Sequence, residues 1–150
     1  MKPIIFLRAA SLLSLLAFLG HTFLFVSYVP THGPEEVALV AAMKSRHFSF
    51  GGFTHSYWEL YFGYGLFVSI SCLVEALLFW QLATLAKSHP SKTRSIVALF
   101  ALGEAGYAIL MLKYFFLVPI VVHIATAICL TAAFITAGRS SPARPGALAR

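Results

Sequence analysis

The chain has 150 residues, of which 59% are hydrophobic and 11% are charged, with a net charge of +6. Soluble domains carry about 25% charged residues, so this composition predicts a protein of the lipid bilayer, and the length predicts a single domain. The chain contains neither Asp nor Asn, which excludes Asp-rich metal–diphosphate motifs, EF-hands and N-glycosylation sites. It also has no glycine-rich phosphate loop, so we expect no nucleotide chemistry. The net charge of +6 would suggest nucleic-acid binding in a soluble protein, but here the distribution of basic residues indicates membrane topology, so we expect no nucleic-acid partner.

The first apolar segment predicts a membrane span over residues 5–29. Lys2 and Arg8 lie at its start, an arrangement that a cleaved signal peptide shares. A signal peptide has an apolar core of about 7–15 residues followed by a small-x-small cleavage site. The apolar run here is longer and ends at 23–29 without such a site, so we expect a transmembrane helix.

Residues 30–46 are more polar and predict a short helix in the membrane interface. Pro34 suits a first helical turn, and the two glutamates that follow it suit the positive end of a helix dipole. Lys44 and Arg46 suit the opposite end. The helix would have about 12 residues, too few for the roughly 20 that a span requires.

An aromatic segment follows at residues 47–65, where eight of nineteen residues are Phe, Tyr or Trp. Gly51 and Gly52 mark a turn within it. We expect this segment to form a collar at the membrane surface that continues into a second span at residues 57–86.

The rest of the chain predicts two more spans. A polar, proline-broken loop precedes a third span at 95–115, and Pro119 starts a fourth at 119–138. Residues 139–150 predict a disordered cytoplasmic tail. The expected fold class is all-α, a polytopic membrane protein with a four-transmembrane-helix bundle, an outer interfacial helix and an aromatic loop, forming one domain over 1–138.

The distribution of basic residues predicts the orientation in the membrane. Eight of them lie on the side of the termini: Lys2, Arg8, Lys87, Lys92, Arg94, Arg139, Arg144 and Arg150. Three lie on the other side: Lys44, Arg46 and Lys113. We therefore expect a multi-pass protein of the cell inner (plasma) membrane with both termini in the cytoplasm.

Four ionisable residues fall inside the predicted spans, where a charge costs at least about 2.5–3.5 kcal/mol. With a rise of about 1.5 Å per residue, Glu75 and Glu104 fall on the order of 10–12 Å above the cytoplasmic boundary. His21 and His123 fall on the order of 18–21 Å above it. The sequence thus predicts a layer of two glutamates and a separate layer of two histidines.

The candidate catalytic residues are Glu104, Glu75 and His123. Two carboxyls in a dry site cannot both ionise at low cost, so one would stay protonated and act as an acid. Glu104 would be that acid, with Glu75 or His123 as its partner. The competing interpretation is that each glutamate is neutral and hydrogen-bonded, with Glu104 reaching Tyr107, and only fixes the register of its helix.

The histidines have two interpretations as well. His21 and His123, with a carboxylate, would suit metal binding or proton transfer, or they are structural. His55 and Glu59 stand four residues apart, the helical spacing of two metal ligands, but a third ligand at fixed spacing is missing. We therefore predict no metal site and no cofactor.

The aromatic collar has two interpretations, one structural and one functional. Tyr and Trp residues form the usual girdle at a membrane boundary. Alternatively Tyr57, Tyr61 and Tyr64 line the mouth of the bundle.

The last span carries a ridge of small residues, Ala125, Cys129, Ala133 and Ala137, which would allow close packing against a partner helix.

Several short motifs together resemble a known family: Gly20-His21-Thr22, Met43, His47-Phe48, the segment 57–66 (YWELYFGYGL), Tyr114-Phe115-Phe116 and Pro119. The family consists of uncharacterised small bacterial integral membrane proteins and is named after a hypothetical protein of leptospires. The resemblance covers most of residues 10–137. It implies four membrane helices and supplies no activity, ligand or catalytic residue.

Our leading functional hypothesis is a membrane protein that binds a lipid-like small molecule inside the bundle or acts as an accessory subunit. The alternative is a membrane-embedded enzyme that performs acid–base chemistry on an apolar substrate. The candidate ligand-binding residues are His21, Tyr57, Glu59, Tyr61, Tyr64, Glu75, Glu104 and His123. The candidate partners are the lipid bilayer, an apolar small molecule, and a second copy of the chain or another membrane protein.

Overall fold

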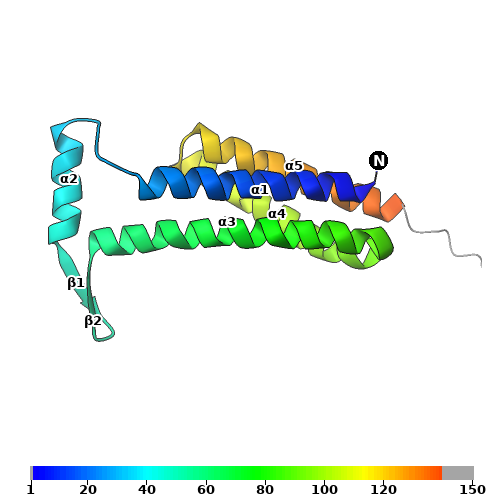
Figure 1. The fold of residues 1–150 in the computed structure, drawn as a ribbon, viewed down its shortest axis with the longest axis horizontal. Coiled ribbons are helices and arrows are strands. Elements are labelled where there is room, and N and C mark those ends of the chain that lie inside the picture. The colour runs from blue at the N-terminus through cyan, green and yellow to red at the C-terminus, as the bar shows by residue number, and fades with distance from the viewer. Residues whose placement is uncertain (1, 140–150) are drawn as a thin grey trace, which may run out of the picture. The chain divides into compact units, whose positions relative to one another are not determined.

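The computed structural model of the chain describes residues 2–139 (Figure 1). Its elements in order are α1 (Pro3–Val26), α2 (Pro34–Ser45), β1 (His47–Phe50), β2 (Phe53–Ser56), α3 (Tyr57–Ser88), α4 (Pro90–Tyr114) and α5 (Leu117–Arg139). Helices α1, α3, α4 and α5 are long and apolar enough to cross a membrane. The fold is all-α, as predicted, and the predicted tail from residue 140 on lies outside the described residues.

Most large apolar side chains of the long helices point outward. Phe23, Leu102 and Leu117, for example, are each at least 70% exposed. Water would make such a surface unstable, but lipid tails are as apolar as these side chains. The exposure therefore fits helices that lie in a bilayer.

The chain forms two compact units. One combines the residues up to Ala17 with those from Leu73 onward, and the other is Phe18–Cys72. Helices α1 and α3 each contribute residues to both units.

The first unit contains the α4–α5 helical hairpin, joined by Phe115 and Phe116. Its core combines residues from four helices: Leu7, Ala10, Phe79, Leu82, Ala83, Ala86, Val97, Leu130 and Ala133. Small residues bring α1 and α3 close, and the Ser11 hydroxyl donates to the Ala76 carbonyl at 2.7 Å. The Phe79 and Phe100 rings meet edge to face with centroids 5.2 Å apart, which ties α3 to α4.

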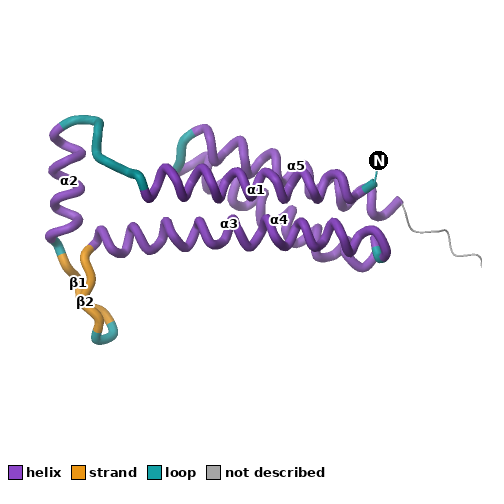
Figure 2. The backbone as a smooth tube through the Cα atoms, in the orientation of Figure 1, coloured by secondary structure: helices purple, strands orange, loops and turns teal. Residues whose placement is uncertain are grey.

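The second unit holds α2 and a β-hairpin (Figure 2, orange). The sequence predicted the turn of this hairpin at Gly51 and Gly52 but not its two strands. Strands β1 and β2 pair antiparallel, with Phe50 opposite Phe53. Gly51 and Gly52 have φ of +59° and +84°, as a type I′ turn requires at both central positions.

The side chains of the hairpin alternate between two faces. One face carries Phe48, Phe50, Phe53 and His55, and the other carries His47, Ser49, Thr54 and Ser56. The hydroxyls of Ser49 and Thr54 are hydrogen-bonded at 2.9 Å, which links the two strands on the polar face. The expected aromatic loop is thus a two-faced hairpin.

The ends of the four long helices differ from the predicted bounds by at most five residues, and α3 starts at Tyr57 as predicted. Helix α1 stops at Val26 rather than 29, and Pro30 disfavours helical backbone at Val29. Helix α4 begins at Pro90 rather than 95, since proline is favoured in a first helical turn. Helix α5 starts at Leu117, two residues before Pro119.

Candidate functional site

A carboxyl–imidazole pair lies in the first unit. Glu104 Oε2 of α4 lies 2.8 Å from His123 Nδ1 of α5. The Glu104 side chain is 2% exposed and that of His123 is 18% exposed. A buried ionisable group needs such a partner, so this contact explains how α4 tolerates an acid in an apolar sequence.

A second carboxyl joins this pair. Glu75 of α3 is half-buried and interacts electrostatically with both Glu104 and His123. All three residues belong to the first unit. We call this group of two carboxyls and one imidazole the acid–base triad.

Neighbouring side chains position the triad. The Tyr107 ring, one turn after Glu104, lies 5.4 Å from the His123 ring at an angle of 51°. The competing interpretation had a hydrogen bond between Glu104 and Tyr107. In the structure, each of these two residues instead contacts His123. Ala108, the next buried residue on α4 after Glu104, is small enough to let α5 approach.

The predicted separation of a glutamate layer from a histidine layer is wrong. Given the observed helix ends, Glu104 lies about 15 Å before the end of α4 and His123 about 9 Å after the start of α5. With the predicted helix ends, the same two distances would be about 16 Å for Glu104 and 6 Å for His123. The observed ends thus reduce the difference in height between the two residues from about 10 Å to about 6 Å, which their two long side chains can span.

His21 lies in the other unit, Phe18–Cys72, and not in the unit of the triad. Its Nε2 is 3.2 Å from the carbonyl oxygen of Gly65, and its ring packs against Phe25. These contacts join α1 to α3 within the second unit, which is the structural role that the sequence left open for it.

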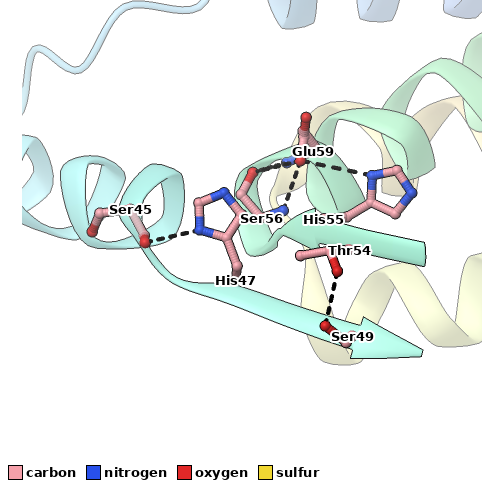
Figure 3. A network of polar contacts seen from close by, with 7 residues as sticks. All are labelled: Ser45, His47, Ser49, Thr54, His55, Ser56 and Glu59. Atoms are coloured by element: carbon pink, nitrogen blue, oxygen red, sulfur yellow. Dashed lines mark hydrogen bonds and ion pairs between the residues drawn. The ribbon is translucent and has the colours of Figure 1, made fainter. Parts of the chain in front are cut away.

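Glu59 forms a capping box at the start of α3 (Figure 3). The Ser56 amide donates to Glu59 Oε2 at 2.6 Å, and the Glu59 amide donates to the Ser56 hydroxyl at 3.1 Å. The two residues therefore satisfy each other's otherwise unpaired backbone groups. His55 Nδ1 lies 3.7 Å from the same carboxylate. The Ser-x-x-Glu spacing of Ser56 and Glu59 is the sequence signal for this capping role, which replaces the predicted ligand-binding role of Glu59.

The three collar tyrosines do not gather into one lining. Tyr57 packs on Phe48 of the hairpin, and Tyr61 packs on Phe25 and Trp58. Tyr64 is more exposed and borders a shallow groove with Glu59. Of the predicted ligand-binding residues, the structure brings together only two sets: Glu75 with Glu104 and His123, and Glu59 with Tyr64.

No protein-family model, curated protein or solved structure matches the chain. The resemblance to the family of small bacterial membrane proteins stays a prediction.

A polar cluster in the second unit joins the segment between α1 and α2 to the first turn of α2. The Tyr28 hydroxyl donates to Glu36 Oε1 at 2.6 Å, and the His32 amide donates to Glu36 Oε2 at 2.6 Å. The hydrogen bond from Tyr28, then that from the His32 amide, lowers the pKa of Glu36 to about 2. The same contact with Glu36 raises the pKa of Tyr28 to about 12. The cluster thus stays intact over a wide pH range.

An apolar groove of about 530 Å³ runs between α4 and α5 in the unit of the triad. Its nine lining side chains are all Ala, Ile or Thr. Ala108 lies one turn after Glu104 and Ala127 one turn after His123, and both line the groove. The groove therefore lies on the same two helices as the Glu104–His123 pair, and its lining includes none of Glu75, Glu104 and His123.

The small-residue ridge of α5 faces the core of its own unit. Ala133 and Ala137 are almost fully buried, and Cys129 packs against the core cluster. The ridge is therefore covered by this chain's own helices and offers little surface to another subunit. Within residues 2–139, no three His, Cys or Glu side chains are arranged to hold a metal ion.

Proposed function

We propose that this chain is a multi-pass inner-membrane protein that binds a lipid-like small molecule at the acid–base triad. The observation that carries the proposal is the 2.8 Å contact between Glu104 and His123, whose side chains are largely buried in an apolar helical unit. Glu75 lies near enough to interact electrostatically with both residues. Ionisable groups in membrane spans are costly, and in membrane proteins they mark ligand or ion sites. The adjacent groove supplies an apolar surface for the rest of such a molecule.

The test is to purify the protein in mild detergent and to identify small molecules that accompany it by mass spectrometry. We expect one lipid-like species near equimolar amounts in wild type, and at least tenfold less in Glu104→Gln. Glu35→Gln is the matched control, because Glu35 is exposed on α2 in the other unit. Equal amounts in wild type and Glu104→Gln would reject the triad as the binding site.

A second candidate is an enzyme of acid–base chemistry on an apolar substrate. It is favoured by the direct contact between a carboxyl and a partly exposed imidazole, the geometry that proton transfer requires. Glu104 would orient His123, and His123 would exchange the proton with the substrate. The same mass spectra separate the two functions, because His123→Gln would retain a molecule of different mass, the unconverted substrate, in an enzyme. A binding protein would simply lose its ligand.

The orientation is also part of the proposal. With both termini in the cytoplasm, the eight Lys and Arg residues of the terminal side lie where positive charge is favoured. Helix α2 and the hairpin then face the outside.

A further inference from the structure

A guanidinium group of the first unit lies outside the acid–base triad and has no counter-ion. Arg8 of α1 lies over the ring of Trp80 on α3, with its Cζ atom 3.2 Å from the ring centroid. Its Nη2 donates to the Thr84 hydroxyl at 3.2 Å. Among the described residues, no carboxylate forms an ion pair with Arg8. The charge of this side chain is therefore not balanced by the chain's own acids.

Most hydrogen-bond donors of Arg8 are also unused. An arginine side chain carries five N–H groups in a planar fork. In residues 2–139, only the group that reaches Thr84 has a partner, and the buried Nη1 has none. An unpaired charge near an apolar core is costly. Because the charge is delocalised over the guanidinium, an anion beside the Nη2 edge would balance it.

The contacts of Arg8 hold its fork in one orientation. The Trp80 ring fixes the plane of the guanidinium. The Thr84 hydroxyl is itself fixed, since it donates to the Trp80 carbonyl oxygen at 3.3 Å. Trp80 and Thr84 are both exposed, so the edge of Arg8 that meets Thr84 lies at the surface of the unit. The site is thus preformed and open on one side.

The level of Arg8 along the helices identifies its environment. Helix α3 has 32 residues and is about 48 Å long, slightly more than the roughly 40–45 Å of a bilayer with its headgroups. Thr84 lies about 6 Å before the end of this helix at Ser88. Since Arg8 contacts Thr84, its guanidinium lies at the level of the lipid headgroups. The anionic groups at this level are lipid phosphates.

The neighbouring charges favour an anion as well. The same end of the unit carries four more basic residues, all exposed: Lys2, Lys87, Lys92 and Arg94. The acids of this unit are Glu75 and Glu104, and each lies about 20 Å along its helix from this end. An anionic headgroup thus meets positive charge here and no carboxylate.

We propose that Arg8, Trp80 and Thr84 form a binding site for the phosphate group of an anionic phospholipid. The phosphate oxygens accept hydrogen bonds from the Arg8 fork, a geometry that arginine favours. The acyl chains lie along the lipid-facing side of α1 and α3, where Leu12 and Leu77 are exposed about one turn deeper. The positive group of a zwitterionic lipid would meet the basic residues of this end and is disfavoured. The site is separate from the triad and does not rest on its proposed ligand.

The experiment uses the full chain with Trp58→Phe, which leaves Trp80 as the only tryptophan. Brominated phosphatidylglycerol and brominated phosphatidylcholine are compared as quenchers of Trp80 fluorescence in phosphatidylcholine liposomes. We expect phosphatidylglycerol to bind beside Trp80 about fivefold more strongly, or better, because its net negative charge is not neutralised within the headgroup. Equal binding of the two lipids would overturn the proposal.

Variants of Arg8 separate a specific site from a general attraction to positive charge. Arg8→Gln should abolish the preference for phosphatidylglycerol. Arg8→Lys keeps the charge without the planar fork and should retain only part of the preference. Arg46→Gln is the matched control, because it removes one positive charge from an exposed position in the other unit. A preference that survives Arg8→Gln would reject the site.

Two further measurements complete the test. Inorganic phosphate at millimolar concentration should leave the preference for phosphatidylglycerol unchanged. If it abolishes the preference, the site takes free phosphate rather than lipid, and the proposal is wrong. Should Arg8→Gln fail to fold by circular dichroism, the comparison of the two lipids in the Trp58→Phe protein and in Arg8→Lys still decides the question.

Discussion

Glu104 is 2% exposed and has its imidazole partner at 2.8 Å, so at the scale of single residues the two side chains depend on each other. Removing one partner leaves the other polar and buried without compensation. Removing both leaves neither member of the pair without its partner, and Glu75 is then the remaining carboxyl of the site. The pair should therefore behave as a unit when it is mutated.

We predict strong non-additivity between Glu104→Leu and His123→Leu. Each single variant should unfold at lower denaturant, and the double variant should lose about 1–2 kcal/mol less than the sum of the two. Unfolding in detergent, followed by circular dichroism, measures this coupling free energy. Strictly additive losses would show that the two side chains do not interact.

The Tyr28–Glu36 contact makes a prediction about pH. Glu36 has a pKa of about 2 instead of 4.5, so its contribution to stability is complete above about pH 4.5 and is lost as the pH falls through about 2. Tyr28 has a pKa of about 12 instead of 10.0, so its contribution is complete below about pH 10 and is lost above about 12. Tyr28→Phe should move the Glu36 pKa upward toward 4.5. Carbon NMR of the Glu36 carboxyl measures this, with Tyr64→Phe as the control, and an unchanged pKa in Tyr28→Phe would refute the contact.

At the scale of elements, α1 and α3 approach closely in the second unit at Gly65. A Cβ atom at this position would overlap the Phe25 ring. That ring is held between Tyr61, Phe62 and His21, so it has little freedom to move aside.

We predict that Gly65→Ala destabilises the protein by about 1–3 kcal/mol through overpacking. Gly63→Ala is the matched control on the same helix, because a Cβ there meets no atom within 4 Å. It should be neutral or stabilising by up to about 1 kcal/mol, since alanine favours helix. Thermal unfolding in detergent compares the two. Equal melting temperatures would mean that the helices do not meet at Gly65.

The sequence predicted the helices well and predicted the turn at Gly51 and Gly52, but it did not predict the two strands on either side of that turn. Apolar runs of about 20 residues leave few alternatives to a helix in lipid, because every backbone group must be paired within the chain. The two strands depend on the alternation of aromatic and polar side chains in HFSF-GG-FTHS. Because the segment is so rich in aromatic residues, it was interpreted as a membrane-surface collar rather than as strands. The start of α4 differed because Pro90 lies inside the first turn rather than in the loop before it, and α5 begins two residues before the predicted start at Pro119.

The residue types of the candidate site were predicted from the sequence, but which residues contact each other was not. Glu75, Glu104 and His123 were identified because ionisable residues are rare in spans. Their partners depend on where two helices begin and end, and a shift of two or more residues there changes which side chains meet. His21 and Glu59 were assigned to a ligand, whereas the structure shows them in contacts with Gly65 and Ser56.

At the scale of the whole molecule, the four long helices and the uneven distribution of Lys and Arg determine the expected topology. We predict that green fluorescent protein fused after residue 150 or inserted after His89 is fluorescent, whereas alkaline phosphatase inserted after Gly33 is active. Activity assays on intact cells make this comparison. The reverse pattern would place both termini outside.

The most direct test of the acid–base triad as a protonated intramembrane site is infrared spectroscopy of the protein in liposomes at neutral pH. We predict a carbonyl stretch from a protonated carboxylic acid in wild type and in Glu35→Gln, with reduced intensity in Glu75→Gln. The absence of any protonated carboxyl at neutral pH, or a band of equal intensity in Glu75→Gln, would contradict the claim that the triad holds a protonated carboxyl.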